Sequence, residues 1–187
     1  MNTTSTQGPH QGFTPDKPAI GTYEQALHHV GRKSARYFAD APISEATVKM
    51  FCAMVEDPNP VYWDPATAQR IFGGPIAPPA LVQSIFFPLP WRPGGAERPS
   101  LAAWAVPLPG RTLINVDSDA VHHRPFFIGD TLSYYDEILS VSPERHTRLG
   151  VGHFVTSAFH IEDADERAVS TVVNTMLRFG SEQEPTR

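Results

Sequence analysis

The chain has 187 residues, of which 41% are hydrophobic and 19% charged, a composition typical of one globular domain with a real core. The net charge of −5 comes from 15 basic and 20 acidic residues, and no Lys/Arg cluster is long enough to indicate a nucleic-acid partner. No apolar run approaches the roughly 18 residues of a membrane span, and a single cysteine, Cys52, fits a cytoplasmic location.

The two ends of the chain and one internal stretch are expected to lack regular structure. Residues 1–20 lack a basic start followed by an apolar block, so they do not resemble a secretory signal, and we expect a flexible N-terminal tail. We expect one domain over residues 21–180 and a flexible tail over 181–187. The stretch 88–111 contains six prolines, three glycines and two tryptophans, which predicts a long loop.

The first strong helical pattern runs over residues 44–56. Ser44 is suited to the N-cap, and Pro58 disfavours helical geometry at Asp57, so the helix should end there. Four apolar side chains recur at i, i+3, i+4 and i+7: Val48, Phe51, Cys52 and Val55. This spacing predicts an amphipathic helix with one buried face.

Two further helices are predicted. Asp64-Pro65 predicts an N-cap followed by proline at the first helical position, and Gly73 predicts the end of this short helix. A second pattern, over residues 75–87, enters through Pro78-Pro79 and is apolar on almost all sides. Such a helix should be buried, most plausibly wrapped by a sheet.

The second half of the chain is rich in Val, Ile, Thr, Tyr and Phe and predicts β-structure. Four strands are expected there and a fifth earlier in the chain: residues 112–123, 130–141, 148–163, 167–179 and 35–39. Their short connections favour antiparallel pairing, because parallel strands need crossovers of about a dozen residues or more. The sequence therefore predicts an α+β fold, with a curved antiparallel sheet around a central apolar helix.

Several short motifs occur in the same order as these elements. They are Asp57-Pro58-Asn59-Pro60-Val61-Tyr62, Asp64, Ala77-Pro78-Pro79, Arg124-Pro125 and Gly129-Asp130-Thr131-Leu132. Together they resemble the hot-dog fold of the MaoC-like hydratase/dehydratase family, and more narrowly its FAS1-like dehydratase or MaoC N-terminal branch. The resemblance spans roughly residues 43–179. It implies an acyl thioester of CoA or acyl carrier protein as the ligand, no other cofactor, and R-specific addition or removal of water at C2–C3.

The active-site loop of this family contains an Asp, then Asn-Pro, and a His five positions after the Asp in catalytically complete members. In this chain Asp57 and Asn59 match, but Tyr62 stands at the His position. A phenol has a reference pKa of about 10, so it donates a hydrogen bond at neutral pH but is a poor base. The resemblance then implies the half of a paired assembly that has lost the dyad, with an Asp/His dyad in a second hot-dog subunit.

The candidate site residues follow from the same resemblance. Asp57 and Tyr62 are the catalytic candidates, although Asp57 could instead brace the loop and Tyr62 could instead pack as an aromatic. The candidate substrate-binding residues are Asn59, Ala77, Pro78, Trp91, Arg124 and Gly129. Pro78 has no N–H for the thioester oxygen, and Arg124 is a candidate for the CoA phosphates. No HxH or HExxH spacing occurs, so we expect no metal site.

Four functions remain open at this point. The chain is the Tyr-bearing subunit of a heteromeric R-specific enoyl-CoA hydratase, with room for a bulky acyl group such as a steroid side chain. Alternatively, it is a self-sufficient homodimeric dehydratase that uses Asp57 and Tyr62, or a non-enzymatic acyl-thioester-binding module. A hot-dog thioesterase would require a carboxylate near the central helix, and the sequence identifies none.

Overall fold

The computed structural model describes residues 17–87, 93 and 101–180, and its main feature is one antiparallel sheet. The strands are β1 (Tyr37–Phe38), β2 (Thr112–His122), β3 (Ser133–Val141), β4 (Arg145–Thr147), β5 (Gly150–Glu162) and β6 (Ala168–Phe179). The sheet order is β1-β3-β5-β6-β2, and β4 pairs with β5 off this path. The predicted strands and their antiparallel pairing are confirmed, and with them the α+β class.

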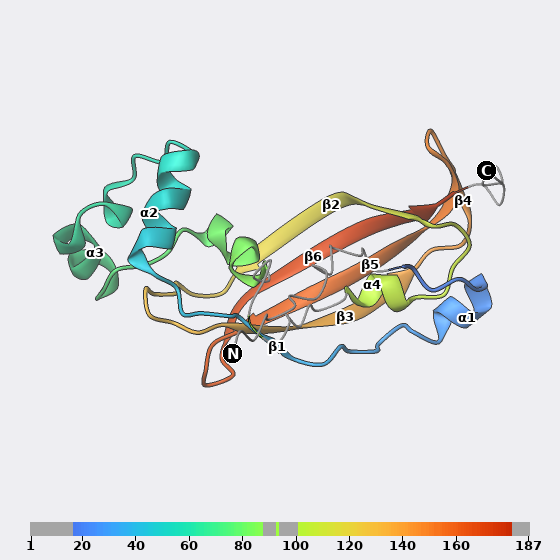
Figure 1. Ribbon diagram of the computed structural model, residues 1–187, viewed down its shortest axis with the longest axis horizontal. Helices are drawn as coiled ribbons and strands as arrows, with labels where there is room; N and C mark the ends of the chain where they lie inside the picture. The colour runs from blue at the N-terminus through green and yellow to red at the C-terminus, as the bar shows by residue number, and fades with distance from the viewer. Residues whose placement is uncertain (1–16, 88–92, 94–100, 181–187) are drawn as a thin grey trace, which may run out of the picture.

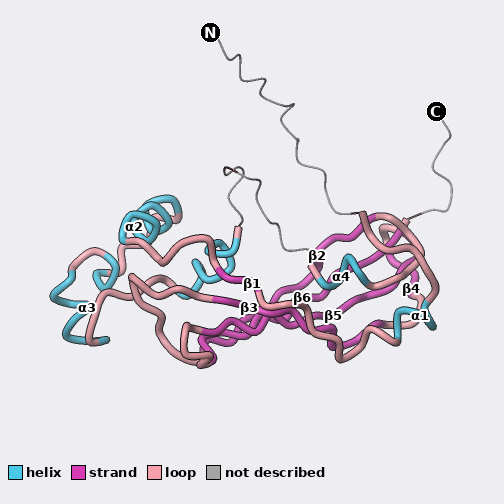
Figure 2. The backbone as a smooth tube through the Cα atoms, turned by 60° about the horizontal axis from the view of Figure 1, so that its bottom comes forward, coloured by secondary structure: helices cyan, strands magenta, loops and turns pink. Residues whose placement is uncertain are grey.

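In the described parts of the chain, six helical segments lie near the two ends of the sheet. They are α1 (Tyr23–Leu27), α2 (Glu45–Met54), η1 (Pro60–Tyr62), α3 (Pro65–Phe72), η2 (Pro79–Phe86) and α4 (Ala102–Ala105). Figure 1 shows α2 and α3 as a lobe beyond one end of the sheet, with α1 and α4 near the other end. The same division is visible from a second direction in Figure 2. No helix in the described ranges is long and apolar enough to cross a membrane.

The core is divided into two clusters that follow this arrangement. The lobe cluster contains Ile43, Val48, Cys52, Ala77, Leu81, Val82, Phe126, Leu132, Tyr134, Ile161, Val169 and Val172. The α4 cluster contains Ala26, Ala103, Val106, Leu108, Ile138, Val141, Val155 and Met176. Both clusters take side chains from β3, β5 and β6, so they lie along one face of the sheet, which we call the inner face.

The predicted helix caps are present. The Ser44 side chain accepts a hydrogen bond from the Thr47 N–H, and α2 ends at Met54, close to the predicted stop. The Asp64 side chain accepts hydrogen bonds from the N–H groups of Ala66 and Thr67 at the start of α3. Each cap satisfies donors that the first turn of a helix leaves unpaired.

The apolar segment after the two prolines differs in detail from the expected central helix. It forms the 3₁₀ helix η2 rather than an α-helix, and only Leu81 and Val82 are buried. Phe87, just after it, is 78% exposed. Pro78 and Pro79 remove two backbone donors at its start, and no side chain caps it, which accounts for the tighter and shorter helix.

The parts of the chain predicted to lack regular structure fall partly outside the described residues. Residues 1–16, 88–92, 94–100 and 181–187 are not described, so most of what was predicted for the two tails and the loop lies outside the described residues. Two described parts carry more structure than expected. The short helix α4 lies within the predicted loop, and Ala19 is held by a hydrogen bond from its N–H to the Trp104 carbonyl.

A fully buried arginine fastens these segments to the sheet. Arg178 on β6 donates from Nε to the Gly110 carbonyl at 2.7 Å and from Nη2 to the Ala19 carbonyl at 2.8 Å. Burial lowers the pKa of Arg178 to about 10, which still leaves it charged at neutral pH. Gly110 is needed at this junction, because its φ is +87° and a Cβ there would lie 2.5 Å from the Phe179 backbone.

Replacing Arg178 should therefore destabilise the fold. In Arg178→Met the side chain keeps much of its volume, but several buried carbonyls lose their donor. We expect the free energy of unfolding to fall by about 2–4 kcal/mol, as for loss of buried charged hydrogen bonds. Urea denaturation measures this loss. The exposed Arg148→Met is the matched control and should change stability by less than about 0.5 kcal/mol; equal effects would contradict the role of Arg178.

Candidate functional site

The loop after α2 is braced by its own polar groups. The Asp57 N–H donates to the Cys52 carbonyl at 2.9 Å, and Asp57 Oδ1 accepts the Asn59 N–H at 2.9 Å. Trp63 Nε1 donates to the Asp57 carbonyl at 2.8 Å, and Asn59 Oδ1 accepts the Val61 N–H at 3.3 Å. Asp57 and Asn59 therefore both stabilise the turn, as in the alternative in which Asp57 braces the loop. These bonds use Oδ1 of Asp57 and do not involve its Oδ2.

Tyr62 lies at the end of this loop and packs partly buried against the lobe cluster. Burial raises the pKa of its phenol, and the neighbouring Asp57 carboxylate and Cys52 raise it further. The phenol is therefore a hydrogen-bond donor at neutral pH and does not act as a base.

Cys52, the only thiol of the chain, is fully buried beneath this loop. Burial raises the pKa of its thiol, and the Asp57 carboxylate raises it further. A thiol that stays protonated in an apolar cluster is a poor nucleophile. Cys52 therefore serves as a core residue here.

No imidazole of this chain lies near the loop in sequence, because no histidine occurs between His29 and His122. His122 and His123 are on and just after β2, where their rings hydrogen-bond Ser170 and Thr171, respectively. The loop itself therefore contains carboxylates but no imidazole. The loop thus provides the carboxylate of an acid/base pair but not the imidazole.

The segment expected to approach the thioester oxygen has little donor capacity. The Ala77 N–H donates to the Phe126 carbonyl at 2.9 Å, within a short bridge between Ile76 and Phe127. The next residue, Pro78, has no N–H. The Ala77 N–H is thus already used by the Phe126 carbonyl, and the assignment of Ala77 and Pro78 to substrate binding stays a prediction.

Arg124 is engaged in an ion pair rather than standing free at the surface. Its Nη2 contacts the carboxylate of Asp163, which Arg167 also binds at 2.8 Å. Arg167 also contacts Asp165 at 3.0 Å, so two arginines and two aspartates balance one another in this cluster. The assignment of Arg124 to the CoA phosphates stays a prediction.

The two remaining candidates are a glycine and a tryptophan. Gly129 forms the turn before β3, with a φ of +99°, and its N–H donates to the Ile43 carbonyl at 2.8 Å. This geometry explains the glycine as a turn residue. Trp91 lies outside the described residues.

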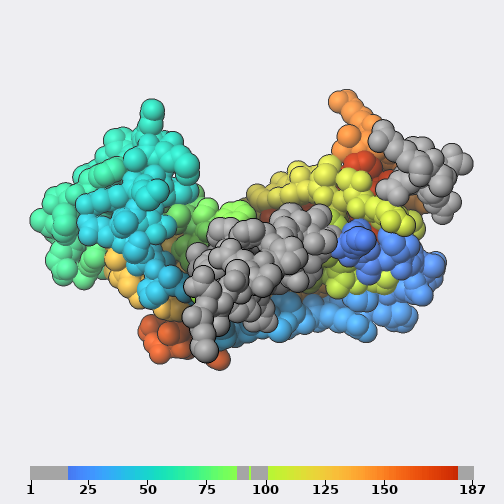
Figure 3. Space-filling model, in the orientation of Figure 1, coloured from blue at the N-terminus to red at the C-terminus, as the bar shows by residue number. Residues whose placement is uncertain are grey.

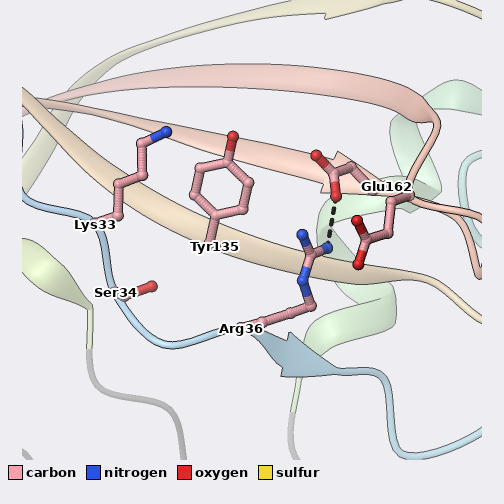
Figure 4. A pocket seen from close by; sticks show the side chains of 6 residues that line it. Lys33, Ser34, Arg36, Tyr135 and Glu162 are labelled. Atoms are coloured by element: carbon pink, nitrogen blue, oxygen red, sulfur yellow. Dashed lines mark hydrogen bonds and ion pairs between the residues drawn. The ribbon is translucent and has the colours of Figure 1, made fainter.

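An open pocket of about 360 Å³ lies on the opposite, outer face of the sheet and was not expected from the sequence (Figure 4). Arg36 Nη1 contacts Glu162 Oε2 at 2.6 Å, and the Tyr135 ring stacks on His160 with ring centres 4.8 Å apart. Its charged groups are largely paired with one another, so we regard it as a surface network rather than the site. In the described parts of the chain, no group of three or more His, Cys, Asp or Glu side chains could hold a metal ion.

Comparison with known proteins is consistent with the geometry of the loop and the sheet. A family model for the FAS1-like dehydratase domain region matches residues 28–172. The chain belongs to this family. The probable enoyl-CoA hydratase alpha subunit of Thermomonospora curvata is 28% identical over 148 residues, which cover 74% of this chain and 45% of that protein. The chain thus spans less than half the length of this curated relative.

Two solved structures are similar in fold. The ChsH1-ChsH2 complex from Mycobacterium tuberculosis gives a TM-score of 0.72 at 23% identity, covering 85% of this chain and 96% of the matched chain. R-hydratase PhaJ1 from Pseudomonas aeruginosa gives a TM-score of 0.54 at 23% identity, covering 84% and 91%. These similarities confirm the predicted hot-dog fold of this FAS1-like dehydratase domain.

The coupling between Asp57 and Tyr62 can be measured by titration. Because the Asp57 carboxylate helps to raise the Tyr62 pKa, Asp57→Asn should lower that pKa towards the ordinary value for tyrosine. Ultraviolet absorbance of the phenolate between pH 8 and 12 reports the shift, with the corresponding Tyr62→Phe proteins subtracted to isolate Tyr62. Asp64→Asn is the control, because Asp64 is committed to its cap. An unchanged Tyr62 pKa in Asp57→Asn would show that the two groups do not interact.

Proposed function

We propose that this chain is the acyl-thioester-binding subunit of a heteromeric R-specific enoyl-CoA hydratase or 3-hydroxyacyl dehydratase. The catalytic Asp/His dyad is supplied by a second hot-dog subunit. One observation carries the proposal: in the family's active-site loop, the half-buried phenol of Tyr62 occupies the place of the imidazole, and its pKa is raised away from neutrality. Such a group contacts and orients a ligand but does not activate water.

The chemistry of hydration explains why a second unit is needed. Addition of water to an α,β-unsaturated thioester requires one group that takes a proton from water and one that delivers a proton to the α-carbon. Both groups must exchange protons near neutral pH. Tyr62 does not meet this requirement, and Asp57 and Asn59 brace the turn, so we assign Asp57 and Asn59 to shaping the loop and Tyr62 to donating a hydrogen bond to the bound thioester.

The relatives support a two-unit assembly. The Thermomonospora curvata protein is named as an alpha subunit, and its length leaves room for a second domain beside the matched part. The ChsH1-ChsH2 structure is a complex of two named components. These names support the proposal that an acyl-CoA is bound and that the working assembly contains two kinds of hot-dog unit.

We assign the docking edge for the second unit to β2. Among the strands of the described residues, β2 pairs only with β6 and forms one end of the sheet order. It is eleven residues long, contains no proline, and exposes Val116 and Val121. Figure 3 shows β2, in yellow, along the upper margin of the molecule. A long edge strand presents unpaired backbone N–H and C=O groups, and here also exposed apolar side chains. The edge strand of a second subunit can pair with these backbone groups and bury the side chains.

Enoyl-CoA hydration assays test the proposed activity. The purified chain alone should not hydrate a panel of 2-enoyl-CoAs, whereas its mixture with an Asp/His-bearing hot-dog protein encoded beside it should. In the mixture, Asp57→Asn in this chain should change turnover by no more than about threefold. Replacing the dyad carboxylate of the second subunit should lower turnover by about 10²–10⁴-fold, the usual contribution of an acid/base group.

The same assays separate the alternatives. Hydration by the chain alone that disappears in Asp57→Asn and in Tyr62→Phe would overturn the subunit proposal in favour of a self-sufficient dehydratase. Acyl-CoA binding without hydration in any mixture would indicate a non-enzymatic module. Hydrolysis of the thioester would indicate a thioesterase.

The docking edge can be tested by a proline. In the register of β2 and β6, His123 donates to the Val169 carbonyl, so the alternation places the Ala120 N–H at the open edge. Ala120→Pro should therefore preserve the β2–β6 bonds but weaken association with the second subunit by at least about tenfold, because one edge donor is lost. Size-exclusion chromatography with light scattering measures association. Ala120→Val is the matched control and should leave it unchanged; unaltered association in Ala120→Pro would place the interface elsewhere.

A further inference from the structure

A row of polar side chains crosses the inner face of the sheet between the two hydrophobic clusters. Ser157 on β5 is the cross-strand partner of Asn174 on β6, and Asn174 is the partner of Ser118 on β2. Direct cross-strand partners point to the same face, with Cβ atoms about 4.5–5.5 Å apart. Asn115 extends this polar row at the β2 edge, where its Nδ2 donates to Ser118 Oγ at 2.7 Å.

The neighbouring positions on both sides of the row are apolar. Phe159 and Val172 are cross-strand partners on the side of the lobe cluster, and Val155 and Met176 are partners on the side of the α4 cluster. The row therefore lies between two apolar cross-strand pairs of the inner face. Burying polar groups in such a setting costs free energy unless each of them finds a hydrogen bond.

The inner end of the row is deeply buried and short of partners. Ser157 is fully buried, and Asp136, on the adjacent strand β3, is 1% exposed. Asp136 Oδ2 accepts the Ala102 N–H at 2.9 Å, but Asp136 Oδ1 and Ser157 Oγ make no hydrogen bond of good geometry. Burial raises the pKa of Asp136, while the Ala102 N–H and the nearby Ser157 hydroxyl act in the opposite direction.

The outer end of the row is accessible. Ser118 and Asn115 are exposed, and Ser118 Oγ donates to Asn174 Oδ1 at 2.6 Å. A continuous polar track thus leads from the β2 edge to the two unpaired oxygens at the centre of the inner face. Each such oxygen left without a partner costs about 1–3 kcal/mol, so a third polar group is expected to meet them.

We propose that Ser157 and Asp136, with Asn174 beside them, bind an uncharged hydroxyl group carried by the acyl part of the ligand, remote from its thioester. This inference rests on the proposed function, because it treats the inner face as part of the acyl-binding site. A hydroxyl fits both oxygens, since it donates one hydrogen bond and accepts others. A plain alkyl chain would leave the two oxygens unpaired and is the poorer ligand.

The row also specifies where along the acyl chain the hydroxyl must lie. Tyr62 packs against the lobe cluster, so the thioester end is placed on that side of the row. On β5 the buried member of the lobe cluster is Ile161, four residues or about 13 Å along the strand from Ser157, and Phe159 packs against the cluster between them. The hydroxyl should therefore lie near the far end of a medium-length chain rather than next to the thioester.

Matched pairs of acyl-CoAs test this inference. We would measure, by calorimetry on the chain assembled with its second subunit, the affinities of decanoyl-CoA and 10-hydroxydecanoyl-CoA, together with the eight- and twelve-carbon pairs. At one chain length the hydroxylated ligand should bind about tenfold more tightly, the effect of roughly 1.4 kcal/mol. Ser157→Ala should remove this preference without weakening the alkyl ligand. Thr156→Val, on the opposite face of the same strand, is the control and should keep it.

The outcomes distinguish this inference from the proposed function. If alkyl and hydroxyl ligands bind equally at every length, the row serves only to hold internal water and the inference is overturned, while acyl-thioester binding stands. If no acyl-CoA of either kind binds, the proposed function itself fails and the inference with it. The preference of the unmodified protein for the hydroxylated ligand tests the inference even if Ser157→Ala does not fold. Asp136→Asn, which keeps the shape of the side chain, is a second variant.

Discussion

The pairing of β5 with β6 is the constraint on which the rest of the structure depends. Its register, from Gly152 opposite Phe179 to Ile161 opposite Ser170, decides which side chains share the inner face. A slip by one residue would turn every one of them to the other face. The two hydrophobic clusters, the polar row between them and the buried position of Arg178 are all consequences of this one register.

Different helical segments pack against the inner face at the two ends of the sheet. At one end, α2, η1 and η2 bring the loop with Asp57 and Tyr62 against the lobe cluster. At the other end, α4 and the segment around Ala19 are held by carbonyl contacts to Arg178 and by the Asp136 carboxylate. The hydrogen bonds within the loop fix its shape, which suits the ligand-orienting role proposed for Tyr62.

Most of the fold was predictable because it rests on local patterns. The caps at Ser44 and Asp64 and the alternation of the long strands depend on chemistry within a few residues, so they were recognised correctly. The apolar pattern of residues 79–86 predicts a helix but not its 3₁₀ geometry, because apolar spacing alone does not distinguish the tighter turns that form after Pro78 and Pro79 without a side-chain cap. The hydrogen bond from the Ala77 N–H to the Phe126 carbonyl could not be predicted from the sequence either, because the two residues lie far apart in the chain.

The sequence by itself determined the family, the antiparallel sheet and the absence of a histidine from the loop with Asp57 and Tyr62, since each depends on residue identity and local spacing. Only the tertiary structure decided the raised pKa of Tyr62, the pairing of Arg124 with Asp163 and the polar row at Ser157 and Asn174. Burial and long-range charge contacts belong to the folded chain as a whole. The physical reason is that strand register brings together side chains that no local pattern connects.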